Sequence, residues 1–185
     1  MKGISNNNKG YSLVELIIVI AIIAVLTGTL IFSISMIFSA NARTCANDIK
    51  SALAETKITS MGKSEAFVEI YRDTNNGCIY SRQFMKKEDG SWYGKDPEKI
   101  GNARVYVAYC VDGGSETELA EGDAIYLAYE RSSGSFMSTG TMQKNDGTSV
   151  AIAYYSKIHV MGGNKDLQVS LIKLTGKVSV EPYTP

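Results

Sequence analysis

The chain has 185 residues, with 19 basic residues, 19 acidic residues and one histidine, so its formal net charge is zero. This balance gives no basic surface of the kind that nucleic-acid binding requires, and we infer no nucleic-acid partner. The length suits one modest domain with an appendage.

An uncharged, largely apolar segment from Leu16 to Ala42 follows a short polar N-terminus. About 20 apolar residues are enough for a helix to cross a bilayer, so we expect a membrane span that ends at about residue 38. Lys2 and Lys9 precede this segment, and positive residues favour the cytoplasmic side, so the rest of the chain should face outward. A cleaved secretory signal fits poorly, because the apolar block is too long and no Ala-x-Ala site follows it.

Glu15 is a carboxylate near the start of this apolar segment. An ionisable side chain inside a membrane is costly and usually has a functional partner. One interpretation is that Glu15 lies at the interface and reaches water. The other requires a cation, which Leu16 to Ala42 cannot supply. Cleavage between Gly10 and Tyr11 would create one, because it frees an α-amine four residues before Glu15.

The stretch Lys9-Gly10-Tyr11-Ser12-Leu13-Val14-Glu15-Leu16, followed by an Ile/Val/Ala run, resembles the type IV prepilin signature. The resemblance covers about residues 9–26. It implies that residues 1–10 are a leader that a prepilin peptidase removes after Gly10. It also implies N-methylation of Tyr11 and a role for Glu15 in filament assembly. Tyrosine instead of the commoner phenylalanine after the cleaved bond is a mild departure from the family pattern.

The helix is predicted to run from residue 11 to residue 62, with Gly62 as the stop signal. In its second half, small and apolar residues recur at three- and four-residue spacing, which predicts a stripe covered by a packed domain. These residues are Ala42, Cys45, Ala46, Ile49, Ala52 and Leu53.

Small residues also fall close to one face of the helix. Such a face suits close helix packing between copies, or it is simply common in such helices. They are Ala21, Ala24, Gly28, Ser35, Ser39 and Ala42. No proline occurs before Pro97, so Thr27-Gly28-Thr29 is the weakest helical stretch.

Residues 63–185 are predicted to form a head of antiparallel strands, which gives an α+β fold with a sheet on the helix. Short segments rich in β-branched residues and tyrosine alternate with turn signals there. The turn signals are Asn75-Asn76-Gly77, Asp112-Gly113-Gly114, Asp146-Gly147 and Thr175-Gly176. The least regular part, Lys86 to Arg104, is interpreted as a surface loop or excursion. It contains Gly90, Trp92, Gly94, Pro97 and Gly101.

The three cysteines are Cys45, Cys78 and Cys110. A disulfide is permitted outside the membrane, and Cys78 and Cys110 are the favoured pair because both lie in predicted strands of the head. The alternative is that both stay free and buried. Relatives in the pilin family often close a C-terminal loop with a disulfide, but no cysteine follows Cys110, so this chain lacks that clamp.

Enzyme signatures are absent from the sequence, and we expect no catalytic site, no cofactor and no metal site. His159 lies in a strand-like run and is interpreted as a structural residue. The segment from Asp73 to Gly77 shares its first residues with calcium-binding loops, but a tight turn accounts for it better. Calcium binding by the head stays open.

The resemblance implies a subunit of a homo-oligomeric helical filament, matured by prepilin peptidase and assembled by a membrane platform with an ATPase. Before assembly the chain would be a single-pass precursor in contact with membrane lipid, and afterwards part of a surface pilus. A type IV pilus for adhesion, motility or aggregation is the first expectation. A pseudopilin of a secretion or DNA-uptake filament is the second. A monomeric surface binding domain on a signal anchor is the third.

Overall fold

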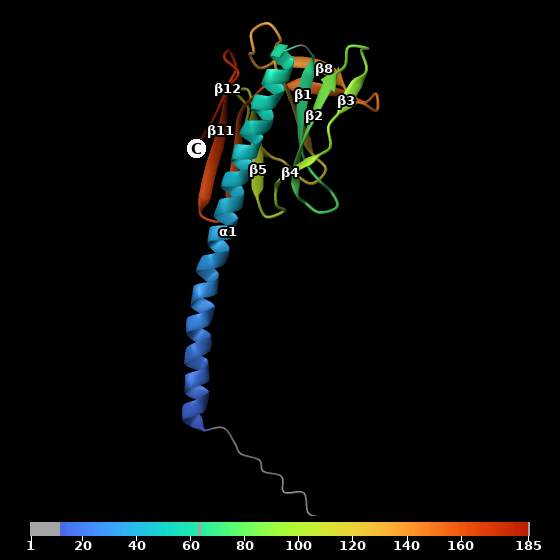
Figure 1. The fold of residues 1–185 in the computed structure, drawn as a ribbon. Coiled ribbons are helices and arrows are strands. Elements are labelled where there is room, and N and C mark those ends of the chain that lie inside the picture. The colour runs from blue at the N-terminus through green and yellow to red at the C-terminus, as the bar shows by residue number, and fades with distance from the viewer. Residues whose placement is uncertain (1–11, 63, 185) are drawn as a thin grey trace, which may run out of the picture.

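One long helix, α1 (Leu13–Gly62), runs from the N-terminal end of the molecule into a β-rich head (Figure 1). The computed structural model describes residues 12–62 and 64–184 of the chain, without the side chains of residues 29–34. The helix has 50 residues, which corresponds to about 75 Å at the usual rise per residue. Its second half lies against the head, and its first half extends away from it (Figure 1).

The helix begins two residues later than predicted because Ser12 caps it. The backbone N–H of Val14 donates to Ser12 Oγ at 3.3 Å, and the N–H of Leu16 donates to the Ser12 carbonyl at 3.1 Å. Serine is one of the preferred N-cap residues because its side chain satisfies an otherwise unpaired N–H of the first turn. The predicted end is confirmed, since Gly62 is the last helical residue.

Among the residues that the structure describes, no helix combines the length and the apolar character needed to cross a membrane. The predicted span to about residue 38 is therefore not confirmed.

The head contains two five-stranded antiparallel sheets where the sequence suggested one. Sheet A has the order β3-β2-β1-β7, with β4 also paired to β2. Sheet B has the order β12-β11-β10-β5-β6. The strands of sheet A are β1 (Ala66–Arg72), β2 (Ile79–Lys86), β3 (Trp92–Gly94), β4 (Glu98–Gly101) and β7 (Ala124–Ala128). Those of sheet B are β5 (Tyr106–Val111), β6 (Glu116–Glu118), β10 (Tyr155–Gly162), β11 (Lys165–Ile172) and β12 (Lys177–Pro182).

The four predicted turns each connect the two strands of an antiparallel hairpin. They join β1 to β2, β5 to β6, β8 (Thr139–Gln143) to β9 (Ser149–Ala153), and β11 to β12. The segment Asp73–Gly77 is such a turn, in which the N–H of Gly77 donates to the Asp73 carbonyl at 2.8 Å. The tight-turn interpretation of this segment is therefore confirmed.

The main core lies between α1 and both sheets. Five of the six predicted helix positions are completely buried, and Ala52 is partly buried against the same cluster. The sheets contribute alternating side chains such as Val68 and Ile70 from sheet A and Ile158 and Val160 from sheet B. This arrangement confirms the predicted stripe on the second half of the helix, and it fixes the direction in which the first half leaves the head.

A second, smaller core lies on the other face of sheet A, beneath the hairpin of β8 and β9. Phe67 of β1 and Phe84 of β2 stack there, with ring centroids 4.8 Å apart. Lys144 and Glu69 form an ion pair that joins the hairpin to sheet A. Because sheet A is covered on both faces, almost every residue of β1 is buried instead of alternate ones.

The segment from Lys86 to Arg104, interpreted as a surface loop or excursion, contains two short strands, so the loop interpretation is wrong. β3 and β4 both pair with the edge of β2 that β1 leaves free. A Cβ atom at Gly94 would approach the ring of Phe84 to 2.8 Å, so glycine lets β3 lie close to the second core. Gly94 is thus one of the glycines that suggested a loop, but its role is to let two strands pack closely.

The cysteines form no disulfide, because Cys45, Cys78 and Cys110 are all free and buried. Cys78 immediately precedes β2 of sheet A, whereas Cys110 lies on β5 of sheet B. The prediction from local sequence placed both residues in strands but could not assign those strands to different sheets. The structure therefore corresponds to the alternative of free, buried thiols.

Candidate functional site

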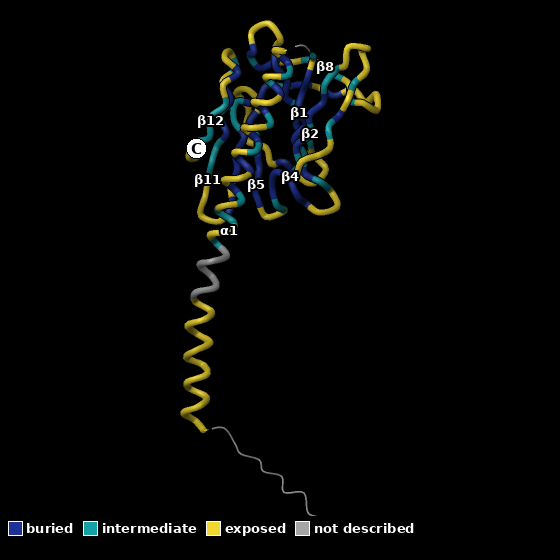
Figure 2. Tube along the Cα trace, in the orientation of Figure 1, coloured by how far each residue is buried: buried dark blue, intermediate teal, exposed yellow. Residues whose placement is uncertain are grey.

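The N-terminal part of α1, up to Gly28, exposes an apolar surface on all sides. From Leu13 to Leu26, its large apolar side chains expose between 50% and 76% of their surface. Figure 2 shows residues 12–28 as exposed, in contrast to the many buried residues of the head. A helix that is apolar all round is normally covered by protein or lipid. This surface is therefore the feature of the molecule that most clearly requires a partner.

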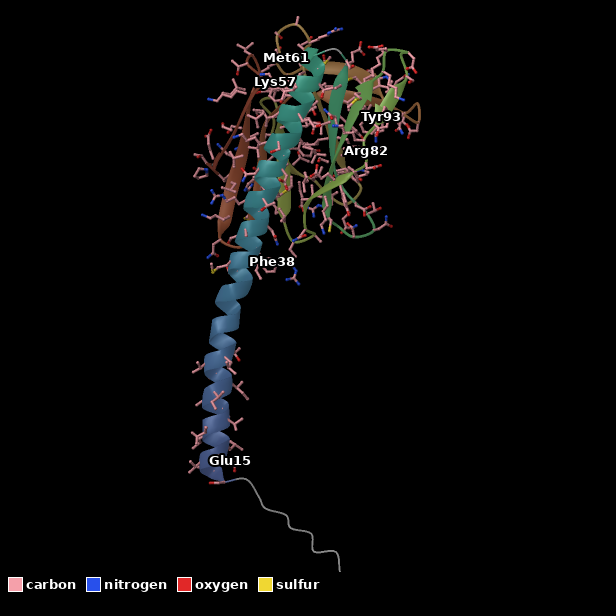
Figure 3. The ribbon with its side chains drawn as sticks, in the orientation of Figure 1. Glu15, Phe38, Lys57, Met61, Arg82 and Tyr93 are labelled. Carbon is pink, nitrogen blue, oxygen red and sulfur yellow. The ribbon has the colours of Figure 1, made fainter. Side chains whose placement is uncertain are left out.

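Glu15 lies in the first turn of α1, at the end of the helix farthest from the head (Figure 3). It is exposed, and Ser12 three residues earlier is the N-cap. A carboxylate in the first turn interacts favourably with the partial positive charge of the unpaired N–H groups. The spacing of Ser12 and Glu15 is also that of a capping box. Glu15 therefore has a local role in starting the helix besides any role in assembly.

Gly10 and Tyr11, the two residues of the predicted cleavage bond, lie outside the described residues. Cleavage after Gly10 would leave Tyr11 as the new N-terminus, directly before the Ser12 cap. The new ammonium would then lie one helical turn from Glu15 in sequence.

Three of the small residues predicted to form a packing face contact the head of the same molecule. Ser39 Oγ accepts a hydrogen bond from the N–H of Asn164 at 3.0 Å, and Ser35 Oγ contacts Asn164 Oδ1 at 3.3 Å. A Cβ atom on Gly162 would lie 3.1 Å from Ala42 Cβ. The small side chains at 35, 39 and 42 therefore let the turn between β10 and β11 approach the helix. Of the predicted face, Ala21, Ala24 and Gly28 remain exposed and available to a partner.

Basic side chains surround the point where the helix leaves the head. The guanidinium of Arg104 lies over the ring of Phe38, at 5.0 Å from its centroid. Arg43 and Lys165 are both exposed, and they line the same surface depression beside the helix. The transition from an uncharged helix to a charged one thus coincides with the lower edge of the head (Figure 3).

Among the described residues, His159 contacts the side chains of sheet B and of the segment that follows β12. Its Nδ1 lies 2.8 Å from Glu116 Oε1, and its Nε2 contacts the Asp166 carboxylate. The ring of Tyr183 stacks on it, with centroids 3.9 Å apart. These contacts join β6, β10, β11 and the C-terminal segment, which agrees with the structural role predicted for this histidine.

The described residues contain no cluster of three or more histidine, cysteine or acidic side chains that could hold a metal ion. Burial, and secondarily the charge of Asp48, raises the pKa of the Cys45 thiol to about 12. A thiol that stays protonated at neutral pH is a poor nucleophile. The helix surface with Glu15 is therefore the candidate functional site.

A comparison with protein families matches residues 5–31 to the prokaryotic N-terminal methylation motif. The chain carries a class III prepilin leader. This prepilin-type N-terminus is consistent with a type IV pilin-like protein and implies processing by prepilin peptidase and filament assembly in general. No curated protein and no solved structure matches the chain.

The matched residues extend from the polar N-terminus into the exposed apolar half of α1, and they include the cleavage bond predicted after Gly10. The pilin-like family is structural rather than enzymatic. The motif supports a pilin or pseudopilin type of subunit, and the head beyond residue 31 lies outside the match.

Proposed function

We propose that the chain is the structural subunit of a type IV pilus. Prepilin peptidase would cleave after Gly10 and methylate Tyr11, and the subunits would polymerise through the first half of α1. The observation that carries this proposal is the apolar surface from Leu13 to Leu26, exposed on all sides and directly continuous with the methylation motif. Lipid would cover this surface in the precursor, and helices of other copies would cover it in the filament.

The proposed role of Glu15 follows from its position. It is the one charged residue between Lys9 and Arg43. A buried carboxylate is stabilised only by a well-placed opposite charge. In a filament, the Tyr11 ammonium of a neighbouring subunit would supply that charge and thereby set the register between copies. An assembly platform with an ATPase would deliver subunits from a membrane pool to the surface filament.

The first experiment is mass spectrometry of the mature protein from cells that express prepilin peptidase. The proposal expects a chain that lacks residues 1–10 and starts with N-methyltyrosine. A mature chain that keeps Met1 would contradict it and would favour the monomeric domain on a signal anchor. Electron microscopy of the cell surface would separate a long pilus from the shorter filament of a pseudopilin, which is the second candidate.

A substitution at Glu15 tests the charge pairing. Glu15→Gln keeps the size of the side chain and its capacity to accept a hydrogen bond at the helix start, but removes the charge. We expect at least a tenfold loss of filament incorporation when no wild-type subunit is present, which corresponds to about 1.4 kcal/mol or more. The readout is the ratio of sheared filament to cell-associated subunit on an immunoblot.

Ser12→Ala is the matched control, because it weakens the N-cap of the same helix by about 1 kcal/mol and leaves the charge pair intact. It should assemble nearly as well as wild type. Normal assembly of Glu15→Gln would overturn the pairing. An equal defect in Ser12→Ala would assign the effect to the helix start instead.

A further inference from the structure

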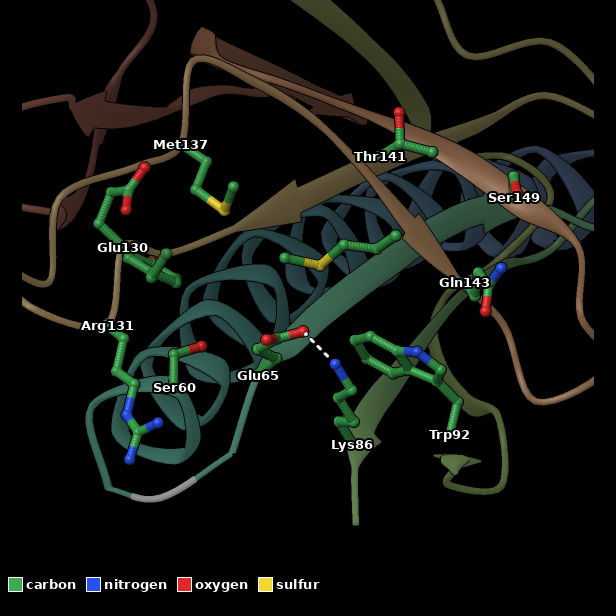
Figure 4. Close-up of a pocket in the computed structure, with 12 residues that line it drawn as sticks. Ser60, Glu65, Lys86, Trp92, Glu130, Arg131, Met137, Thr141, Gln143 and Ser149 are labelled. Atoms are coloured by element: carbon green, nitrogen blue, oxygen red, sulfur yellow. Dashed lines mark hydrogen bonds and ion pairs between the residues drawn. The ribbon is translucent and has the colours of Figure 1, made fainter. Parts of the chain in front are cut away.

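A cleft of about 490 Å³ opens at the end of the head where α1 finishes. Its walls come from the end of α1, the edge of sheet A at β2 and β3, the segment after β7, and the hairpin of β8 and β9 (Figure 4). Its volume falls in the range typical of small-molecule sites. The lining residues are far from the apolar helix surface, so the proposed assembly does not use them.

One side of the cleft is aromatic and apolar. Trp92 of β3 lies in the wall and packs on Phe67 at a centroid distance of 5.4 Å. Met137 and Met142 also line the cleft and are only partly buried against the second core. An indole ring that packs on one side and faces a cleft on the other offers a flat surface for an apolar face of a ligand.

The rest of the wall is polar, and its donors and acceptors are balanced. Lys86 and Arg131 are cations, and Glu65 and Glu130 are carboxylates. Lys86 and Glu65 pair at 3.1 Å, whereas the described residues give Arg131 and Glu130 no ionic partner. Thr141, Gln143 and Ser149 add hydroxyl and amide groups, whereas the buried Ser60 hydroxyl already donates to the Ala66 carbonyl.

Tyr129 also lines the cleft but offers no exposed donor. Its side chain is only 3% exposed, and its hydroxyl is itself buried without a hydrogen-bond partner within the described part of the chain. The groups that could meet a ligand are therefore the side chains at the surface of the cleft.

We propose that this cleft binds a neutral saccharide. A charged ligand would be attracted by one pair of charged side chains and repelled by the other. Sugar hydroxyls each donate and accept hydrogen bonds, so they can satisfy both the cations and the carboxylates. The apolar face of a sugar ring fits the indole of Trp92.

The site has room for more than one sugar ring. A second depression of about 340 Å³ adjoins the first and shares Glu65, Lys86 and Arg131 with it. A chain of sugars could therefore cross from Trp92 toward Arg131. We accordingly assign the site to an oligosaccharide. The inference concerns the head alone and does not depend on filament assembly.

The test uses Trp92, which is the one tryptophan of the chain, so fluorescence excited where tryptophan absorbs and tyrosine does not reports this cleft. The full chain is titrated in a sugar-free detergent with neutral trisaccharides built on glucose, galactose, mannose or N-acetylglucosamine. We expect a saturable change in Trp92 fluorescence for at least one of them, with a Kd of ~1 mM or tighter. Absence of a saturable change for all four, with the protein folded, overturns the proposal.

Variants separate the proposed contacts from nonspecific effects. For a trisaccharide that binds the wild type, Arg131→Met should raise the Kd about fivefold or more, because it removes a hydrogen bond to a sugar hydroxyl. Lys177→Met, at an exposed position on β12, is the matched control and should leave the titration unchanged. Equal binding by wild type and Arg131→Met contradicts the proposed site. A fluorescence change that follows protein concentration without sugar also contradicts it, because the cleft would then be covered by a second copy.

Discussion

At the scale of single residues, Arg72 has the most demanding environment in the head. It is only 7% exposed, and none of the ion pairs among the described residues includes it. Its guanidinium instead donates to the backbone carbonyls of Leu119, Gly77, Ala103 and Val105, at 2.8 to 3.4 Å. One side chain thereby fixes three separate connections between strands. The planar fork of arginine suits such a set of acceptors, and the single ammonium of lysine does not.

Arg72→Met should lower the free energy of unfolding by about 3–5 kcal/mol, because several buried carbonyl groups lose their donor. The measurement is the urea midpoint, with the slope of the unfolding free energy on urea unchanged. Arg43→Met, an exposed arginine on α1, is the control and should change stability by less than ~0.5 kcal/mol. If Arg72→Met lowers the free energy of unfolding by as little as Arg43→Met does, the prediction is contradicted, and water replaces the missing donor.

At the scale of elements, the C-terminal segment is held by side chains as well as by strand pairing. β12 pairs with β11, and Tyr183 just beyond it reaches back over His159. The Tyr183 hydroxyl donates to Glu116 Oε2 at 2.9 Å, and Glu116 also contacts His159. A contact between β6 and the residue after β12 therefore joins the two opposite edges of sheet B.

The stability that these contacts of Glu116 with His159 and Tyr183 contribute should depend on pH. Partial burial alone raises the pKa of Glu116, but hydrogen bonds from His159 and Tyr183 outweigh it and hold the pKa below its ordinary value of 4.5. The carboxylate therefore contributes stability above that ordinary value, and the contribution is lost as pH falls through the lowered pKa of the folded state. Glu116→Gln should be less stable than wild type at pH 7, and the difference should disappear in acid.

The measurement is the urea midpoint of both proteins at several pH values from neutral to acid. Tyr183→Phe removes one of the two hydrogen bonds and should show a smaller difference with the same trend. A difference between wild type and Glu116→Gln that is constant with pH would mean that the charge of Glu116 is unimportant.

At the scale of the whole molecule, the helix changes character at Ser35. Before it, the described side chains are exposed, and from Ser35 onward the helix contacts its own head. All the helix residues of the main core lie after this point. The head and the second half of α1 therefore form one folding unit, and the first half is an extension that depends on other partners.

A fragment that starts at Ser35 should consequently fold and stay soluble without detergent, with the melting temperature of the full chain. A fragment that starts at Ala46 loses the buried side chains of Ala42 and Cys45 and exposes part of the core. We expect its melting temperature to be lower by about 5 °C or more. Circular dichroism melting curves of the two fragments provide the test, and equal melting temperatures would contradict the boundary at Ser35.

The sequence predicted the local features of this fold well and the long-range ones poorly. The helix end at Gly62, the stripe from Ala42 to Leu53 and the four turns depend on nearby residues, and the structure confirms them. The division into two sheets depends on pairing between distant strands, which residue patterns do not encode. The loop prediction between Lys86 and Arg104 failed because glycines such as Gly94 made the segment look irregular, although Gly94 provides space beside Phe84.

The two functional features, the helix surface with Glu15 and the cleft at Trp92, differ in the same way in how far the sequence predicted them. The motif around Gly10, Tyr11 and Glu15 is contiguous, so it could be recognised from sequence. The cleft at Trp92 is built from five separate segments and has no continuous signature. The single tryptophan, in a segment interpreted as a loop, was the only sign of it in the sequence.

The free cysteines have a consequence for a filament under tension. In the filament proposed for this chain, an applied force would pass from the N-terminal helices into each head through the packing of α1 on the sheets. The three thiols are unlinked, and no cysteine lies after Cys110 to tie the C-terminal strands covalently. The extension of a pulled head would therefore be limited by strand pairing and side-chain packing, and reducing agents would leave its mechanical resistance unchanged.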